Sequence, residues 1–155
     1  MASPSSTFPD PITNPANPLY LYPNENPSLV LVSPLMNGKN YHTWVRAMKQ
    51  ALISKNKFVL VTGSFPVPEL SAPNYYDWQR CNTTVLSWIR CSLTESIARS
   101  ILNVEHADKA WKDLRDRFSE ADIFRISDLL EEIYHLHQGD LSVGDYFTEL
   151  KILWD

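Results

Sequence analysis

Hydrophobic side chains recur at helical spacing from residue 41 onward. The first set falls at i, i+3, i+4, i+7 and i+11, a spacing that places apolar residues on one face of a helix. Its members are Tyr41, Trp44, Val45, Met48 and Leu52. The pattern predicts an amphipathic helix that begins after Asn37-Gly38 and fades near Lys55-Asn56-Lys57.

Three further helices are expected in the middle of the chain. The stretch Phe58–Pro73 holds a glycine and three prolines and predicts a loop. A second helix starts near Asn74, and Thr94 is suited to cap a shorter third one. The apolar stripes are Trp78, Cys81, Val85, Trp88 and Ile89; then Ile97, Ile101 and Leu102; then Ala107, Ala110, Trp111, Leu114 and Phe118. On the polar side of the fourth helix, i,i+4 ion pairs are expected for Asp108–Lys112 and Asp113–Arg117.

Two more helices follow. The fifth spans about Asp122 to Gln138, and Gly139-Asp140 stops it. Ser142-Val143-Gly144-Asp145 resembles a capping box and starts the sixth, inside which the chain stops. The side chains expected to face inward are Ile123, Ile126, Leu129, Leu130, Ile133 and Leu136, then Tyr146, Phe147, Leu150, Leu153 and Trp154.

These stripes predict an all-α fold, a small orthogonal helical bundle of about five to six helices. We expect one helical domain over residues 29–155, truncated in its last helix. Roughly 120 residues suffice to bury about two thirds of the unfolded surface in one core. The expected core residues are Trp44, Trp78, Trp88, Trp111, Phe118, Leu130 and Ile133.

The N-terminal end has a different composition. Eight of the 11 prolines precede residue 35, among many Ser, Thr and Asn residues. Proline fixes φ and lacks a backbone donor, so residues 1–28 are expected to form a disordered tail. Residues 29–32 are either a short strand or an extended segment docked on the domain. The start lacks signal-peptide features and no apolar run suffices for a membrane span, so an intracellular, cytoplasmic protein is expected.

Charge is distributed unevenly along the chain, whose net charge is −4. Residues 37–60 carry five basic groups and no acid, whereas residues 121–155 carry eight acids against two bases. An acidic chain is a poor default binder of nucleic acid. The basic cluster is a solvated face, an RNA-facing surface or a surface for an acidic partner. Opposite charge at the two ends of the domain suits head-to-tail packing of subunits. Its members are Lys39, Arg46, Lys49 and Lys57, with Lys55 beside them.

No arrangement of residues indicates catalysis or metal binding. The chain has no phosphate-binding glycine motif and no nucleophile or zinc-protease motif. Glu131 and Glu132 are adjacent, so on a helix they point about 100° apart. His135 and His137 point about 200° apart and are not an i,i+4 metal-binding pair. We therefore expect no catalytic residue, no cofactor, no metal and no small-molecule substrate.

The two cysteines, Cys81 and Cys91, are expected to be buried thiols. They lie ten residues apart on one predicted helix, about 15 Å along its axis. A disulfide requires Cα atoms within about 7 Å. Their spacing is also not that of a zinc site.

Several segments, in order, resemble the N-terminal, capsid-like region of the Gag polyprotein of plant copia-type LTR retrotransposons. They are Asn17-Pro18-Leu19-Tyr20-Leu21-Tyr22-Pro23, residues 26–32, Leu35-Met36-Asn37-Gly38-Lys39-Asn40-Tyr41 with Trp44, residues 85–89, residues 110–118, residues 139–143 with 145–151, and Leu153-Trp154-Asp155. The resemblance implies a non-enzymatic structural protein that self-associates in virus-like particles enclosing the element's RNA. Its partners would be further copies of itself or other Gag chains.

Gag of this type commonly continues into a C-x2-C-x4-H-x4-C zinc knuckle that binds RNA, and this sequence contains none. Two alternatives therefore accompany the structural role. One is a truncated or host-retained adaptor that binds Gag or other proteins without forming particles. The other is a weak RNA-binding module that uses the basic first helix.

Overall fold

The computed structural model describes residues 13–119 and 122–154, including side chains except those of residues 122–125 and 154. Within these residues the chain forms six α-helices and one 3-10 turn, and no strand. The elements are α1 (Tyr41–Ser54), η1 (Phe58–Leu60), α2 (Tyr75–Cys91), α3 (Glu95–Ser100), α4 (Ala107–Phe118), α5 (Asp122–His135) and α6 (Val143–Trp154). The all-helical prediction is confirmed, although α5 ends three residues before the expected Gln138.

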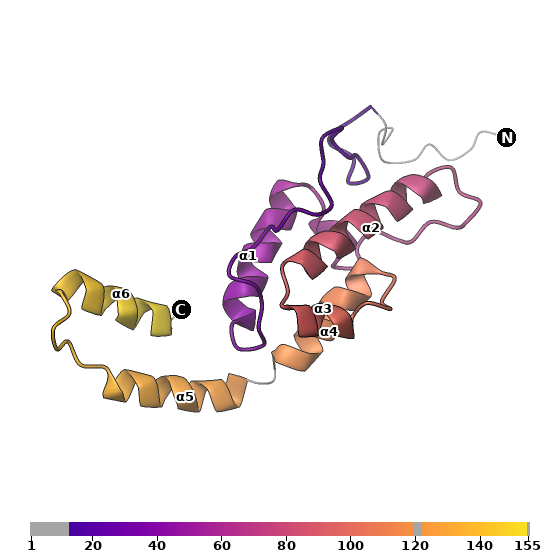
Figure 1. Ribbon diagram of the computed structural model, residues 1–155. Helices are drawn as coiled ribbons and strands as arrows, with labels where there is room; N and C mark the ends of the chain where they lie inside the picture. Colours follow the sequence, from indigo (N-terminus) through magenta and orange to yellow (C-terminus); the bar gives the residue numbers. More distant parts are fainter. Residues whose placement is uncertain (1–12, 120–121, 155) are drawn as a thin grey trace.

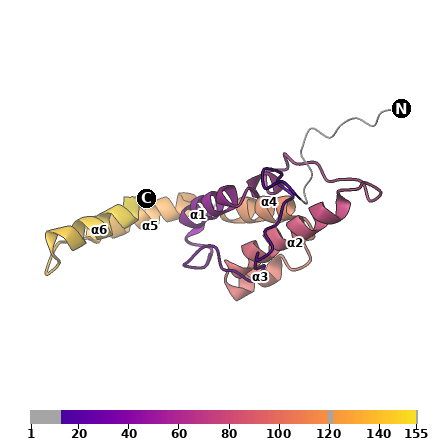
Figure 2. The ribbon, with the colours of Figure 1, turned by 90° about the horizontal axis from the view of Figure 1, so that it is seen from above.

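The helices fall into two groups in space. Helices α1 to α4 pack together, whereas α5 and α6 form a hairpin that extends away from them on one side (Figures 1 and 2). Within the first group α2 packs on α4, and within the hairpin α5 packs on α6. We call the two parts the helical body and the hairpin.

The core of the helical body is built on tryptophans from three helices. Trp44 of α1 and Trp88 of α2 are fully buried, and Trp78 is buried near the start of α2. The Trp44 ring lies 6.1 Å from that of Trp111, which is half-buried at the margin of the core with Phe118. The Trp44 Nε1 donates to the Ser92 carbonyl oxygen at 2.9 Å, so its polar atom is satisfied inside the core.

The segment before α1 is extended and docked, which decides between the two alternatives left open for residues 29–32. Val32 is buried, and the Met36 N–H donates to the Ser92 carbonyl at 3.0 Å. The Thr94 N–H donates in turn to the Met36 carbonyl at 3.0 Å. Thr94 occupies the N-cap position of α3 as predicted, but its hydroxyl makes no capping hydrogen bond, and the backbone pairing with Met36 holds the turn instead.

Gly38 precedes α1, at the point after which the sequence predicts the helix to begin. Its φ is +93°, a conformation that side-chain-bearing residues rarely adopt. A Cβ at this position would lie 3.3 Å from Cε1 of Phe118. Glycine at this position therefore allows both the positive φ and the close approach of Phe118 at the end of α4.

Part of the predicted disordered tail is packed instead. Residues 17–27, which we call the N-terminal strap, lie across the body, with Leu19 inside the core. The Cys81 thiol donates to the Leu19 carbonyl at 3.0 Å, and the Trp88 Nε1 donates to the Asn26 carbonyl at 2.8 Å. The prolines do not prevent this packing, because side chains of the core donate hydrogen bonds to strap carbonyls and no regular ladder of backbone hydrogen bonds is needed. Residues 1–12 of the predicted tail lie outside the described residues.

The hairpin differs most from the sequence prediction. The sequence predicts Leu130 and Ile133 in the core, but 62% of the Leu130 surface is exposed, and Ile133 is only half-buried. The physical reason is that α5 packs on α6, whereas the helical body leaves the rest of its apolar surface uncovered. The Ile123 and Trp154 side chains lie outside the described residues.

Local polar contacts follow the predicted helix chemistry in part. The Asp113–Arg117 pair forms at 3.1 Å, whereas Lys112 pairs with Asp116 at 3.5 Å instead of with Asp108. At the start of α6 the Asp145 N–H donates to the Ser142 hydroxyl oxygen at 3.1 Å, as a capping box requires. The Ser142 hydroxyl donates to the Asp145 carboxylate at 2.7 Å, which stabilises the cap further.

Candidate interaction surfaces

Three exposed cations lie on or beside α1. Lys39 precedes the helix, and Arg46 and Lys49 are on its solvent side together with Ile53, of which 55% is exposed. The Lys49 Nζ lies 5.4 Å from the centre of the Phe58 ring. We call this surface, formed by Lys39, Arg46, Lys49 and Ile53, the α1 outer face.

Lys57 does not belong to this face, contrary to the sequence prediction. The Lys57 N–H donates to the Leu52 carbonyl at 2.8 Å and the Asn56 N–H to the Ile53 carbonyl at 2.9 Å, with Asn56 at a φ of +56°. This Schellman end of α1 turns the chain back over the helix. Lys57 is consequently buried, and its Nζ donates to the Tyr20 carbonyl at 2.6 Å.

The burial of Lys57 changes its chemistry. Loss of solvation lowers the pKa of its ammonium, an effect that the nearby Cys81 and Glu25 oppose. Lys55 is likewise occupied, because its Nζ lies 2.5 Å from the Glu25 carboxylate and 4.9 Å from the centre of the Trp88 ring. Two of the five basic groups predicted to form a surface therefore hold the strap in place.

The hairpin carries the second candidate surface. Ile126, Leu130 and Tyr134 recur every four residues along α5, and Val143 and Phe147 are four apart on α6. All five are exposed, Tyr134 to 82% and Phe147 to 60%. We call this set the hairpin apolar face. Single exposed apolar residues are ordinary, but a cluster on one small element is typical of an interaction site.

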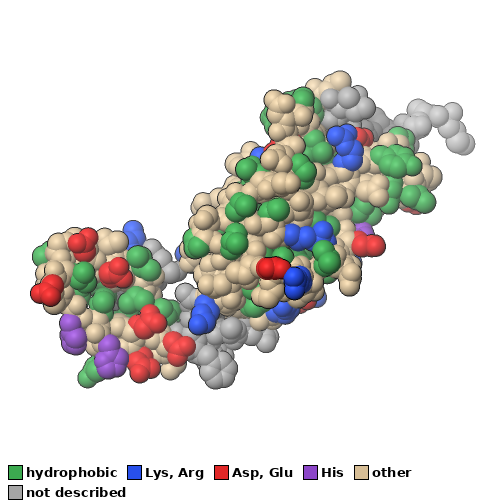
Figure 3. All heavy atoms as spheres, in the orientation of Figure 1, with side chains coloured by type: hydrophobic (Ala, Val, Ile, Leu, Met, Phe, Trp, Pro, Cys, Tyr) green, Lys and Arg blue, Asp and Glu red, His purple; other side chains and the backbone are tan. Residues whose placement is uncertain are grey.

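Carboxylates occupy the other side of the hairpin helices, because Asp128 lies about 200° around α5 from Leu130 and Asp145 about 200° around α6 from Phe147. Residues 122–154 hold seven acidic side chains against two basic ones. Among them Asp128, Glu131 and Glu132 on α5 and Asp145 and Glu149 on α6 are exposed. Figure 3 shows the acidic side chains spread over the hairpin with hydrophobic side chains between them. The hairpin surface is thus apolar and negative, whereas the α1 outer face is positive.

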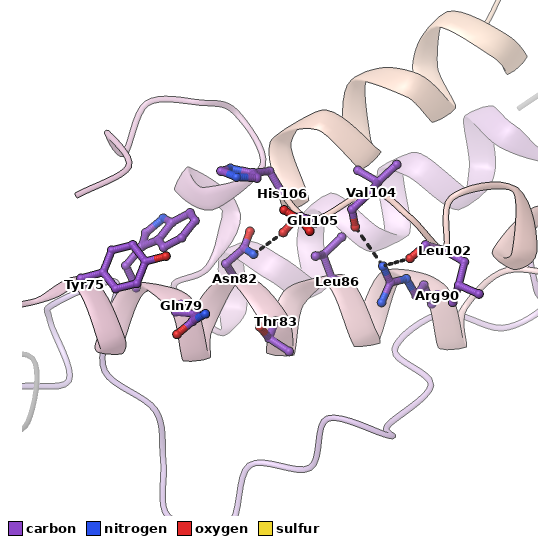
Figure 4. Close-up of a pocket in the computed structure, with 11 residues that line it drawn as sticks. Tyr75, Gln79, Asn82, Thr83, Leu86, Arg90, Leu102, Val104, Glu105 and His106 are labelled. Atoms are coloured by element: carbon purple, nitrogen blue, oxygen red, sulfur yellow. Dashed lines mark hydrogen bonds between the residues drawn. The ribbon is translucent and has the colours of Figure 1, made fainter. Parts of the chain in front are cut away.

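A groove of about 390 Å³ runs along α2 beside the connection between α3 and α4. Figure 4 shows Arg90 at one end of it, its guanidinium donating to the carbonyls of Leu102 at 3.2 Å and Val104 at 2.9 Å. Further along, the Asn82 amide donates to the Glu105 carbonyl at 2.7 Å and accepts from the Ala107 N–H at 2.8 Å. These side chains hydrogen-bond to the backbone of the connection and hold it against α2. We therefore interpret the groove as a structural contact and not as a ligand-binding site.

Within the described residues, no group of three or more His, Cys, Asp or Glu side chains is arranged to hold a metal ion. None of the described helices has the length and apolar character needed to cross a bilayer.

Comparison with known families supports the sequence interpretation. Residues 22–69 match the family model described as the Gag-polypeptide of LTR copia-type. The match extends from the end of the strap through the docked segment, α1 and η1 into the following loop. It therefore contains the α1 outer face and Lys57, and the resemblance to copia-type Gag is confirmed over this segment. No curated protein and no solved structure matches the chain.

Proposed function

We propose that this chain, whose residues 22–69 match the copia-type Gag-polypeptide family model, is a non-enzymatic structural domain that self-associates in the assembly of virus-like particles inside the cell. The observation that carries the proposal is the hairpin apolar face, which the helical body leaves uncovered. The occupant we propose for this face is a second copy of the chain.

The energetics of burial support this proposal. Complete burial of one large apolar side chain stabilises by roughly 1.5–3 kcal/mol. Five such side chains, only partly covered on association, supply several kcal/mol before the entropic cost of association is subtracted.

The test is the concentration dependence of molar mass, measured by light scattering and sedimentation velocity. Self-association is expected for the natural chain and is expected to be lost in a Leu130→Glu, Phe147→Glu double variant. A Tyr76→Glu, Leu102→Glu double variant is the matched control, since 72% of Tyr76 and 63% of Leu102 are exposed on the helical body. A natural chain that stays monomeric at high concentration would refute the proposal and favour the adaptor alternative.

Weak RNA binding is the second candidate function. It is favoured by the exposed Lys39, Arg46 and Lys49 in a segment, residues 37–60, that contains no acid. Three cations release few counterions, so a shallow salt dependence with a slope of about −2 to −3 is expected. Arg46→Glu with Lys49→Glu should remove most binding of a single-stranded RNA, and unchanged affinity would exclude this role.

A further inference from the structure

We infer that two copies pair through their hairpins in an isologous dimer, in which α5 of each copy packs on α6 of the other and Glu131 of one copy lies beside Lys151 of the other. This inference rests on the proposed self-association and specifies how the two hairpin apolar faces meet. The competing arrangement of the same faces sets α5 on α5 and α6 on α6.

The exposed apolar side chains of both hairpin helices lie on the same side of the hairpin. Leu130 precedes the half-buried Ile133 by three residues, and Phe147 precedes the half-buried Leu150 by three. Each exposed side chain is therefore turned about 60° in the same sense from the side on which the two helices pack. Because α5 and α6 run antiparallel (Figures 1 and 2), equal turns bring both side chains to one face.

Most carboxylates of the hairpin do not oppose a contact between two such faces. Four of the seven acids in residues 122–154 lie two residues from Leu130 or Phe147, and so about 200° around their helix from the apolar face. They are Asp128, Glu132, Asp145 and Glu149. When two apolar faces meet, these four carboxylates remain on the outside of the pair, in contact with water.

Two other charged side chains border the apolar face. Glu131 lies about 60° around α5 from Tyr134, on the margin away from α6. Lys151 lies about 40° around α6 from Phe147, on the margin away from α5. Both side chains are exposed. The apolar face therefore has a negative edge along α5 and a positive edge along α6.

These two edges distinguish the two arrangements. When the two-fold axis runs along the hairpin, α5 of one copy lies on α6 of the other, and each negative edge meets a positive edge. Two Glu131–Lys151 pairs then flank the apolar contact. When α5 lies on α5, Glu131 is beside Glu131 and Lys151 is beside Lys151, so both edges carry like charges. Charge therefore favours the packing of α5 on α6.

The inferred pair is a four-helix bundle in which each helix is antiparallel to both of its neighbours. An isologous contact uses the same surface on both copies, so it closes at two. The hairpin would thus supply a dimeric unit, and any larger assembly would have to use another surface of the chain.

Charge reversals in the full chain test the arrangement. Glu131→Lys alone and Lys151→Glu alone place like charges at both edges, and each should weaken the dimer roughly tenfold, since one exposed ion pair contributes up to about fivefold. The double variant restores opposite charges and should dimerise within a few-fold of the natural chain. Sedimentation velocity over a range of concentrations gives the Kd, and circular dichroism spectra establish that the helices are kept.

Matched controls exclude a general effect of net charge. Glu132→Lys makes the same change as Glu131→Lys on the far side of α5, and Lys109→Glu makes the same change as Lys151→Glu at an exposed position of α4. Both controls should dimerise like the natural chain. A loss of affinity in the controls equal to that in the edge variants would show that the edges have no special role.

A mixture of the natural chain with the double variant separates the two arrangements further. With α5 on α6, a mixed dimer brings like charges together at both edges, so each chain should pair with its own kind. With α5 on α5, a mixed dimer brings opposite charges together and should exceed its statistical share. Native mass spectrometry with an isotope-labelled natural chain measures the share of mixed dimer.

The outcomes separate this inference from the proposed function. If the natural chain dimerises and a single reversal leaves the Kd unchanged, the packing of α5 on α6 is wrong while self-association stands. An excess of mixed dimer would overturn the inference in the same way. If the natural chain itself never associates, the inference and the proposed function both fail.

Discussion

The helical body and the hairpin both consist of amphipathic helices, but the apolar side chains of these helices are buried to different extents. In α2 the stripe that contains Trp78, Val85 and Trp88 is fully inside the core. In α5, Ile126 and Leu130 of the predicted stripe are each more than half exposed, and Ile133 is half-buried. Both stripes have helical periodicity, so periodicity alone does not separate them.

The difference lies in the number of neighbours that each helix has. Helix α2 is covered by α4, by the strap through Asn26 and by Lys55, the residue after α1, which contacts Trp88. Helix α5 has α6 as its packing partner. A stripe of apolar residues indicates that another element packs on it. It does not indicate whether that element belongs to the same chain or to another one. We propose that another copy covers the hairpin.

Removal of a core side chain should distinguish the helical body from the hairpin most strongly. Trp88→Ala should lower the free energy of unfolding by about 3–5 kcal/mol, because it empties a fully buried site and removes the hydrogen bond to the strap. Phe147→Ala, on the hairpin, should cost less than about 1 kcal/mol at low protein concentration. Urea unfolding of both variants measures the difference, and similar losses would mean that the hairpin is part of one common core.

The second comparison sets a buried lysine against an exposed one from the same basic cluster. Lys57→Met should cost about 1–3 kcal/mol, because it leaves the Tyr20 carbonyl without its buried donor. Lys49→Met, on the solvent side of α1, should change stability by no more than about 0.5 kcal/mol. Equal effects in urea unfolding would show that Lys57 does not anchor the strap.

The Cys81 thiol makes the strap contact sensitive to alkaline pH. Burial raises its pKa from 9.0 to about 11, so folding favours the protonated thiol that donates to the Leu19 carbonyl. The resulting stability is complete below pH 9 and is lost as pH rises toward about 11, by on the order of 2 kcal/mol. A Cys81→Ala variant should lack this loss when unfolding is compared at pH 8 and 10.5. An identical decline in both proteins would refute the assignment to Cys81.

The smallest expected effect is that of salt on association. Raising the salt concentration from about 50 to 300 mM shortens the screening length and should change self-association by no more than a few-fold, because the contact through the hairpin apolar face is mainly apolar. Sedimentation velocity at both concentrations gives the ratio. A much larger change in either direction would show that the contact is mainly electrostatic.

The sequence predicts the helices of the body well because their side chains are covered within the chain itself. The stripe from Tyr41 to Leu52 and the start of α2 after Asn74 appear in the structure as predicted. The strap could not be predicted in this way, since its contacts join residues 30 to 62 positions apart without any periodicity. Leu19 with Cys81 and Tyr20 with Lys57 are examples.

The candidate site was predictable in composition but not in detail. Charge along the chain identifies the basic segment and the acidic end, and Lys39, Arg46 and Lys49 are exposed there as a surface requires. Lys57 is lost from that surface because the Schellman turn at Asn56 redirects it inward, which a count of charges does not reveal. The exposure of Leu130 depends on how few elements pack on α5, and that is a property of tertiary structure alone.

Amide hydrogen exchange measured over a range of protein concentrations tests the central claim most directly. Amides of α5 and α6 should exchange quickly in dilute solution and become protected as concentration rises, whereas those of α2 should be protected equally throughout. Hairpin exchange that is independent of concentration, while α2 remains protected, would contradict the claim that a second copy covers the hairpin.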